Sequence, residues 1–136
     1  MAKQLSGFEM NIDKTLEEYL SKAAPEQLAE ARKNAVIAMG MAWADQAKLI
    51  TRAEGHIDTG LYINSIGYVT GNPATSDDVL YNLFHSGQLT RLEIGSNVHY
   101  AESLEKRYNI FGNALDSALP RMQAVAEFQV KKSLFG

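Results

Sequence analysis

A row of apolar residues with helical spacing, in the first half of the chain, most limits the folds open to it. The row is rich in alanine and consists of Leu28, Ala31, Ala35, Met39, Trp43, Ala47 and Ile50. Spacings of three and four give one continuous apolar face, which predicts a helix from a first turn at Pro25 to about Thr51. Because alanines and Gly40 let another backbone approach closely, we expect this face to be mostly core, with part of it able to pack on another subunit.

The residues before this helix carry a shorter helical pattern. Apolar residues recur on one face at Ile12, Leu16, Tyr19 and Leu20. Asn11 or Asp13 can cap the start of such a helix through a short acceptor side chain. No internal repeat or low-complexity tract divides the chain. We therefore expect a helical extension over residues 1–24 on a single domain that spans residues 1–136.

After Gly55 the pattern changes from helical to extended. Three segments carry strand-type residues, namely Ser65–Thr70, Val79–His85 and Leu89–Gly95. In the last of them, Leu92 and Ile94 alternate with charged residues, as in a strand with one buried face. Ser86-Gly87, between the second and third segments, predicts a hairpin turn.

Two more helices are expected near the C-terminus. The first covers Tyr100–Tyr108, and the face of the second is formed by Ala118, Met122, Val125, Ala126 and Val130. Pro120 leaves two starts open for the second helix: a cap at Ser117 with Pro120 in the first turn, or a start near Asn113 with a kink at Pro120. Strands in a run between helices are typical of α+β domains. The predicted fold is α+β, a long N-terminal helix packed on a small antiparallel sheet, with a C-terminal helix.

Composition excludes several classes of protein. The 136 residues include no cysteine, which excludes disulfide frameworks, thiol catalysis and thiolate metal sites. The formal net charge of −3 argues against a protein that wraps nucleic acid, although the wall of a DNA passage can be mildly acidic. The chain starts without an apolar signal core, and its most apolar stretch, Ala35 to Trp43, is too short to cross a bilayer. We expect no membrane association.

Residue patterns typical of catalysis are scarce. The sequence has no phosphate-binding glycine loop, nucleophile elbow or helical metalloprotease motif. His56, His85 and His99 lie on separate segments without metal-ligand spacing. His56-Ile57-Asp58 can be interpreted as a base with an orienting carboxylate, but a turn in which Asp58 caps the next element is the simpler interpretation. We therefore expect no catalytic residue, no metal and no cofactor.

Two segments together resemble the neck, or minor capsid, connector family of long-tailed phages. The first reads Asp58-Thr59-Gly60-Leu61-Tyr62-Ile63-Asn64-Ser65-Ile66, and it is similar to the family's Asp-Thr-Gly, apolar anchor and Ser-Ile after a long helix. The second reads Leu92-Glu93-Ile94-Gly95-Ser96-Asn97-Val98-His99-Tyr100-Ala101, followed by Glu105. It is similar to the family's strand ending in Gly, short turn, Tyr-Ala, and glutamate four residues further on. The resemblance covers about Leu28 to the C-terminus.

The resemblance implies a non-catalytic tail-completion protein of the virion neck, present in the host cytoplasm during assembly. Identical subunits would form a ring around the DNA channel through heterologous contacts. Adjoining head-completion and tail proteins are the implied partners, DNA passes without sequence-specific binding, and the separate subunit can stay monomeric. The residues assigned to shaping the fold and the interface are Asp58, Thr59, Gly60, Leu61, Tyr62, Ile63, Ser65, Ile66, Gly95, Tyr100, Ala101 and Glu105.

The chain departs from the family's pattern at two places. Leu61 and Ile63 stand where the family often has basic residues, and Lys106-Arg107 stand where it often has Phe-Gly. We expect Leu61 and Ile63 to be exposed on the isolated subunit and covered by a neighbour in the ring. Two other functions stay open, a small metal-independent hydrolase that uses Asp58 with His56 or His99, and an adaptor module without a role in a virion.

Overall fold

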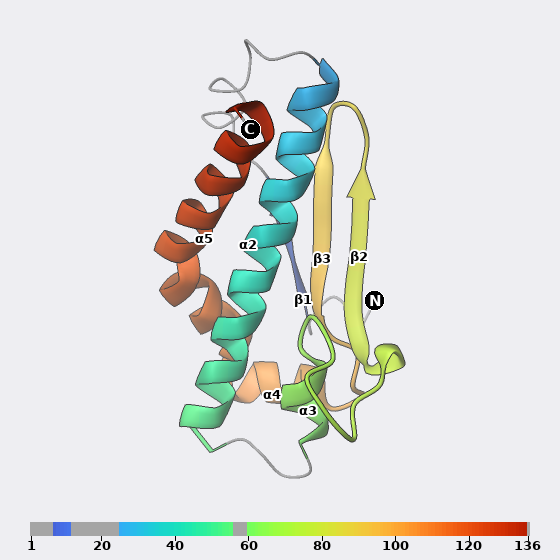
Figure 1. The fold of residues 1–136 in the computed structure, drawn as a ribbon. Helices are drawn as coiled ribbons and strands as arrows, with labels where there is room; N and C mark the ends of the chain where they lie inside the picture. The colour runs from blue at the N-terminus through green and yellow to red at the C-terminus, as the bar shows by residue number, and fades with distance from the viewer. Residues whose placement is uncertain (1–6, 12–24, 56–59, 136) are drawn as a thin grey trace.

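Two long helices and a small sheet dominate the computed structural model, which describes residues 7–11, 25–55 and 60–135. Helices α2 (Pro25–Ala53) and α5 (Ile110–Phe135) run side by side, and α2 also lies against the sheet (Figure 1). The short helices α3 (Leu61–Ser65) and α4 (Ala101–Tyr108) lie at the same end of the molecule. The predicted α+β fold is confirmed.

The sheet consists of three antiparallel strands in the order β1–β3–β2. The strands are β1 (Gly7–Asn11), β2 (Val79–His85) and β3 (Thr90–Ser96). Tyr81 lies opposite Ile94, and Leu83 lies opposite Leu92. Because paired residues point to the same face of a sheet, these four side chains share the face that packs into the helical core.

The predicted hairpin is confirmed, and the remaining strand comes from an unexpected place. β2 has the predicted bounds, and a hydrogen bond of 2.8 Å from the Ser86 N–H to the Leu89 carbonyl closes the turn before β3. Residues 7–11 pair with β3 as a strand, so the helical extension expected over residues 1–24 is wrong there. The helix expected from about residue 12 to residue 20 lies outside the described residues.

The strand predicted over Ser65–Thr70 is wrong. Helix α3 ends at Ser65, and the chain then turns back on itself, so that the Thr70 N–H donates to the Asn64 carbonyl at 3.0 Å. Gly67 has a φ of 74°, in the left-handed region that side chains disfavour. The segment does contain residues that favour strands, but its backbone turns and so cannot pair with a neighbouring strand.

Helix α2 is buried on two sides, which explains its small residues. Towards α5, Ala31 and Ala35 form a cluster with Ala126 and Val130. Towards the sheet, Gly40 leaves no space for a side chain, since an added Cβ would lie 2.5 Å from the Leu92 Cδ2. The predicted apolar face is therefore covered by this chain itself, as most of a core helix should be.

Helix α5 runs through Pro120 without stopping. It begins at Ile110, directly after Asn109 ends α4 with a left-handed φ of 51°. The Ser117 hydroxyl donates back to the Asn113 carbonyl at 2.8 Å, so the alternative in which Ser117 caps the helix is wrong. Pro120 cannot donate a backbone hydrogen bond to the preceding turn, and α5 bends in its middle part (Figure 1).

Gly67 and Gly55 allow a matched test of how tightly the turn after α3 is packed. Both have a φ of 74°, but an added Cβ would lie 2.7 Å from the Ala44 Cβ at Gly67 and would meet nothing within 4 Å at Gly55. We expect Gly55→Ala to lower the free energy of unfolding by about 1–2 kcal/mol, through backbone strain alone. Gly67→Ala should lower it by about 1–3 kcal/mol more, through overpacking. Urea unfolding followed by circular dichroism measures both, and equal losses would contradict the packing of this turn on α2.

Candidate functional site

The two segments that carry the family resemblance meet in space. The Gly67 N–H, just after the first segment, donates to the Gly95 carbonyl in the second at 2.9 Å. Beside this contact the Ser65 and Ser96 hydroxyl oxygens are 2.7 Å apart, and both side chains are fully buried. We call these four residues the motif junction.

The donors in the motif junction can be assigned by counting protons. The Ser65 hydroxyl donates to the Tyr62 carbonyl at 2.8 Å, so its single proton is used. Ser96 must therefore donate to Ser65, while its own oxygen accepts the Val98 N–H at 3.3 Å. Each buried hydroxyl thus donates and accepts, which satisfies the polar groups where α3 meets β3.

An aromatic cluster next to the motif junction joins α3 to the long helices. The cluster consists of Trp43, Tyr62, Tyr100 and Phe111. Tyr62 stacks on Phe111 with ring centroids 6.1 Å apart and lies 6.4 Å from Tyr100. Trp43 meets Phe111 edge-on at 4.9 Å and donates its indole N–H to the Phe111 carbonyl at 3.1 Å. One ring from α5 therefore fixes side chains of both α2 and α3.

Glu105 holds the beginning of α5. Its carboxylate accepts the Phe111 N–H at 2.8 Å and the Gly112 N–H at 3.3 Å, which are donors without partners inside the helix. Burial raises the pKa of Glu105, and the backbone donors oppose that rise. The glutamate of the second resembling segment thus caps a helix.

The Tyr62 hydroxyl is buried and, among the described residues, has no hydrogen-bond partner. Burial raises the pKa of this phenol, with Glu105 and then Tyr100 adding to the rise. Burial therefore keeps this phenol protonated and uncharged near neutral pH.

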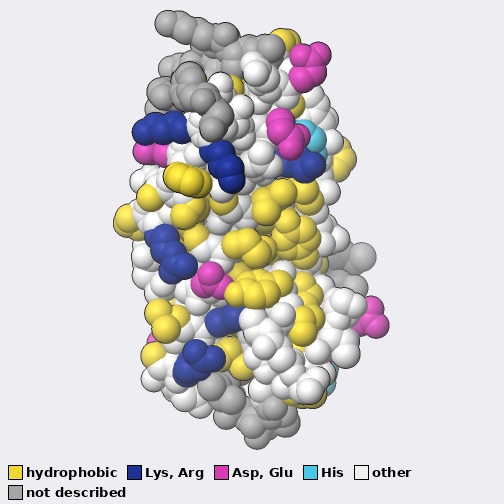
Figure 2. All heavy atoms as spheres, in the orientation of Figure 1, with side chains coloured by type: hydrophobic (Ala, Val, Ile, Leu, Met, Phe, Trp, Pro, Cys, Tyr) yellow, Lys and Arg dark blue, Asp and Glu magenta, His cyan; other side chains and the backbone are white. Residues whose placement is uncertain are grey.

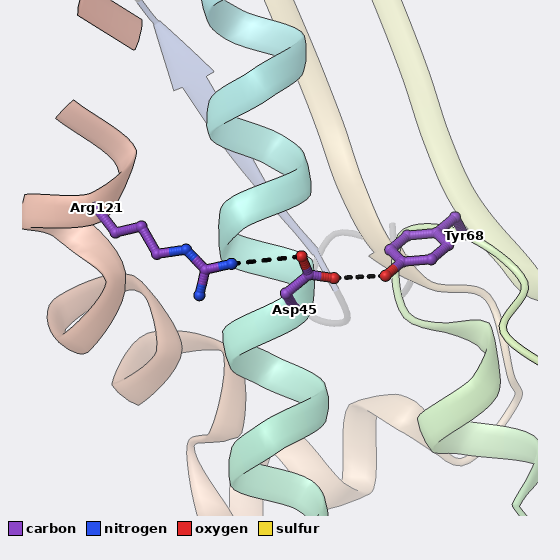
Figure 3. Close-up of polar contacts among 3 residues, drawn as sticks. All are labelled: Asp45, Tyr68 and Arg121. Carbon is purple, nitrogen blue, oxygen red and sulfur yellow. Dashed lines mark hydrogen bonds and ion pairs between the residues drawn. The ribbon is translucent and has the colours of Figure 1, made fainter. Parts of the chain in front are cut away.

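A polar network ties the turn after α3 to both long helices. Asp45 lies between Tyr68, which donates its hydroxyl to one carboxylate oxygen, and Arg121, whose guanidinium is 3.5 Å from the other (Figure 3). Lys48 donates to the Tyr68 carbonyl at 2.8 Å and to the Thr70 hydroxyl at 3.2 Å. Its ammonium also lies 3.6 Å from the centre of the Tyr68 ring.

Burial and hydrogen bonding together shift the pKa values of Lys48 and Tyr68 in this network. Burial lowers the pKa of Lys48 to about 8, and Asp45 opposes the change. The hydrogen bond to Asp45, followed by burial, raises the pKa of Tyr68 to about 12. Because Lys48 is hydrogen-bonded to Tyr68 and Thr70, the network ties the turn after α3 to α2. Lys48 was missed in the sequence, although it lies four residues after Ala44 on the face that meets the sheet.

The assigned motif residues lie mostly inside the molecule. Buried members of the set are Tyr62, Ile63, Ser65, Ile66, Gly95 and Ala101. Gly60 precedes α3 with a φ of 91°, while Leu61, Tyr100 and Glu105 are half-buried. Asp58 and Thr59 lie outside the described residues.

The expected exposure of Ile63 is wrong, since this side chain is only 5% exposed. Helix α3 packs against α2, β3 and the 3-10 turn Ser76–Asp78, and this short helix therefore buries most of its side chains. Leu61 is partly covered rather than exposed. These two positions shape the packing of α3 more than they present an outer surface.

The described histidines are not gathered into a site. The His85 Nδ1 lies 2.8 Å from the Thr90 hydroxyl, and His99 meets the Tyr100 ring edge-on. Among residues 7–11, 25–55 and 60–135, no group of three or more His, Asp or Glu side chains could hold a metal ion. His56 and Asp58, on which the hydrolase alternative depends, lie outside these ranges.

Comparison with protein-family models, with curated proteins and with solved structures gives no match to this chain. None of the helices that the structure describes is long and apolar enough to cross a membrane.

Glu105 and Glu102 allow a matched test of the helix cap. Glu105→Ala should lower the free energy of unfolding by about 1–2 kcal/mol, because the Phe111 and Gly112 donors lose their acceptor. Glu102→Ala removes the same charge from α4 but breaks only a 3.5 Å ion pair with an exposed lysine, so its loss should stay within about 0.5 kcal/mol. Thermal and urea unfolding compare the two; similar losses would contradict a capping role.

The lowered pKa of Lys48 predicts a pH dependence of stability. Between pH 8 and about 10, the unfolded chain still binds the lysine proton that the folded chain has released. The free energy of unfolding should therefore rise with pH in this window more steeply than in Lys48→Met. Between pH 6 and 7 both states of the wild type carry the proton, so the two proteins should show parallel profiles. Parallel profiles up to pH 10 would contradict the burial of this ammonium.

Proposed function

We propose that this protein is a head–tail connector of a tailed phage, a structural subunit that acts by assembly and carries no catalytic centre. Identical subunits form a ring at the head–tail junction, between head-completion and tail proteins, and DNA passes through the ring without sequence-specific binding. A net charge of −3 suits a channel that must not hold DNA tightly.

The contact between the two resembling segments supports this proposal most. They are separated along the chain, yet the Gly67 N–H donates to the Gly95 carbonyl and the Ser96 hydroxyl donates to the Ser65 hydroxyl. Glu105 of the second segment then caps the helix whose Phe111 stacks on Tyr62 of the first. Residues of the two segments that resemble the connector family thus form one structural unit, as expected if the chain shares the fold of that family.

Exposed apolar side chains supply surfaces for a ring. On α5, Phe128 is 63% exposed and Leu119 is 45% exposed. On the β2–β3 hairpin, Phe84 is 54% exposed. Figure 1 places α5 and the hairpin on opposite sides of α2. A heterologous, ring-closing contact requires two different surfaces on each subunit, and these exposed side chains on α5 and on the hairpin are candidates for them.

Deletion of the gene from its phage or prophage tests the proposed role. We expect electron microscopy of lysates to show full heads and complete tails that are not joined, and a plasmid copy of the gene to restore joined particles. Phe128→Asp should fold but fail to restore joining, whereas Gln123→Asp, which adds the same charge to an exposed position of α5, should restore it. Joined, infectious particles without any copy of the gene would overturn the proposal.

A further inference from the structure

Strand β2 is an unprotected edge of the described sheet. Among residues 7–11, 25–55 and 60–135 it pairs with β3 alone, and its seven residues, Val-Leu-Tyr-Asn-Leu-Phe-His, include no charged residue and no proline. Its register with β3 is continuous, without a bulge. Natural edge strands usually carry a charged residue, a proline or a bulge. Such a feature is needed because an open row of backbone donors and acceptors pairs readily with another strand.

The pairing with β3 determines which backbone groups of β2 face outward. The Asn97 N–H donates to the Asp78 carbonyl at 2.7 Å before β2, and the Ser86 N–H donates to the Leu89 carbonyl after it. Even-numbered residues are therefore the hydrogen-bonded partners of β3, because such pairs alternate along an antiparallel ladder. The N–H and C=O groups of odd-numbered residues, Tyr81 and Leu83 among them, point out from the open edge.

The edge is complementary to itself when a second copy runs antiparallel about Asn82. In this register Tyr81 lies opposite Leu83 of the other copy, and two outward-facing residues meet in a hydrogen-bonded pair. Leu80 lies opposite Phe84 on the other face, where both are at least partly exposed in the single chain. Hydrophobic side chains already gather over the region of α2 and β2 (Figure 2), so pairing extends an apolar surface.

The charges at the two ends of β2 also favour antiparallel pairing of two copies of this strand. Asp77 and Asp78 directly precede the strand. At the other end, Arg32 and Lys33 lie close enough to act electrostatically on His85, with Glu30 opposing them, and Arg91 lies over the Phe84 ring. An antiparallel pair places the acidic end of each copy beside the basic end of the other, whereas a parallel pair would join like charges.

We infer that the free protein is a two-fold dimer in which the β2 strands of two copies pair antiparallel about Asn82 to form one continuous six-stranded sheet. The inference goes beyond the connector role and replaces the monomer expected for the separate subunit. A two-fold pair cannot belong to a ring whose subunits all face the same way. The dimer is therefore the form outside the virion, in which the unpaired backbone groups of β2 are covered until assembly.

Single cysteines test the register, because the natural chain has none. At the two-fold axis the Asn82 residues form a non-hydrogen-bonded pair, with Cα atoms about 4.5 Å apart, within the range of a disulfide. Asn82→Cys should oxidise to a covalent dimer on a non-reducing gel. Phe84→Cys, exposed on the same face, lies opposite Leu80 of the other copy and should stay monomeric on that gel. Equal cross-linking of both variants, or none of Asn82→Cys, would overturn the register.

Charge substitutions test the pairing in the full-length protein by light scattering over a dilution series. The wild type should have twice the chain mass of 15.0 kDa. On dilution, the Asp77→Lys dimer should dissociate at a higher protein concentration than the wild-type dimer. Adding Lys33→Asp should restore the dimer, whereas Asp116→Lys, an equal charge change on α5, should leave it intact. A wild-type monomer, or open-ended aggregates, would overturn the inference. Neither result bears on the connector role, which is tested by electron microscopy of phage particles.

Discussion

The burial of α2 on two opposite sides is the constraint on which the rest of the structure depends. One side faces α5 through Ala31 and Ala35, and the other faces β3 through Gly40, where even a methyl group would collide with Leu92. A helix with large side chains on both sides would hold its neighbours too far apart for the aromatic cluster to close. Small residues therefore bring α5 and the sheet close enough for Phe111 to contact Trp43 and Tyr62.

The side of α2 that faces the sheet ends in a buried cation at each end. Arg32 donates to the Thr90 hydroxyl at 3.0 Å and to the Ser86 carbonyl at 2.7 Å, at the hairpin. Lys48 donates to the Tyr68 carbonyl, at the turn after α3. A buried charge is tolerated only where its donors find acceptors, so these two residues fix the loops beyond both ends of the sheet.

Elements with strong local signals could be predicted from the sequence. The long helix and the β2–β3 hairpin follow from spacing, alternation and a turn pair, and none of these depends on distant contacts. Strand β1 could not be predicted, because five residues become a strand only when β3 supplies their partners. Pro120 was ambiguous for a related reason, since packing along α2 carries α5 past a residue that would end an isolated helix.

The candidate site shows the same division between local and distant information. Both segments were found in the sequence through their resemblance to the connector family, but their contact through Ser65 and Ser96 depends on how α3 packs against β3. The buried cations were missed because charged residues are normally exposed. A second row at four-residue spacing, from Arg32 through Val36, Gly40 and Ala44 to Lys48, was the available signal. That row was hidden by the stronger apolar row beside it.

The positions at which this chain departs from the family pattern now fall into two kinds. Ile63 is buried, so its departure changes the packing of α3 and says little about charged contacts with a neighbour. Lys106 and Arg107 are exposed on α4, and Lys106 pairs with Glu102 on the same helix. The interior residues therefore bear on whether the fold is shared, while the exposed ones bear on which partners it meets.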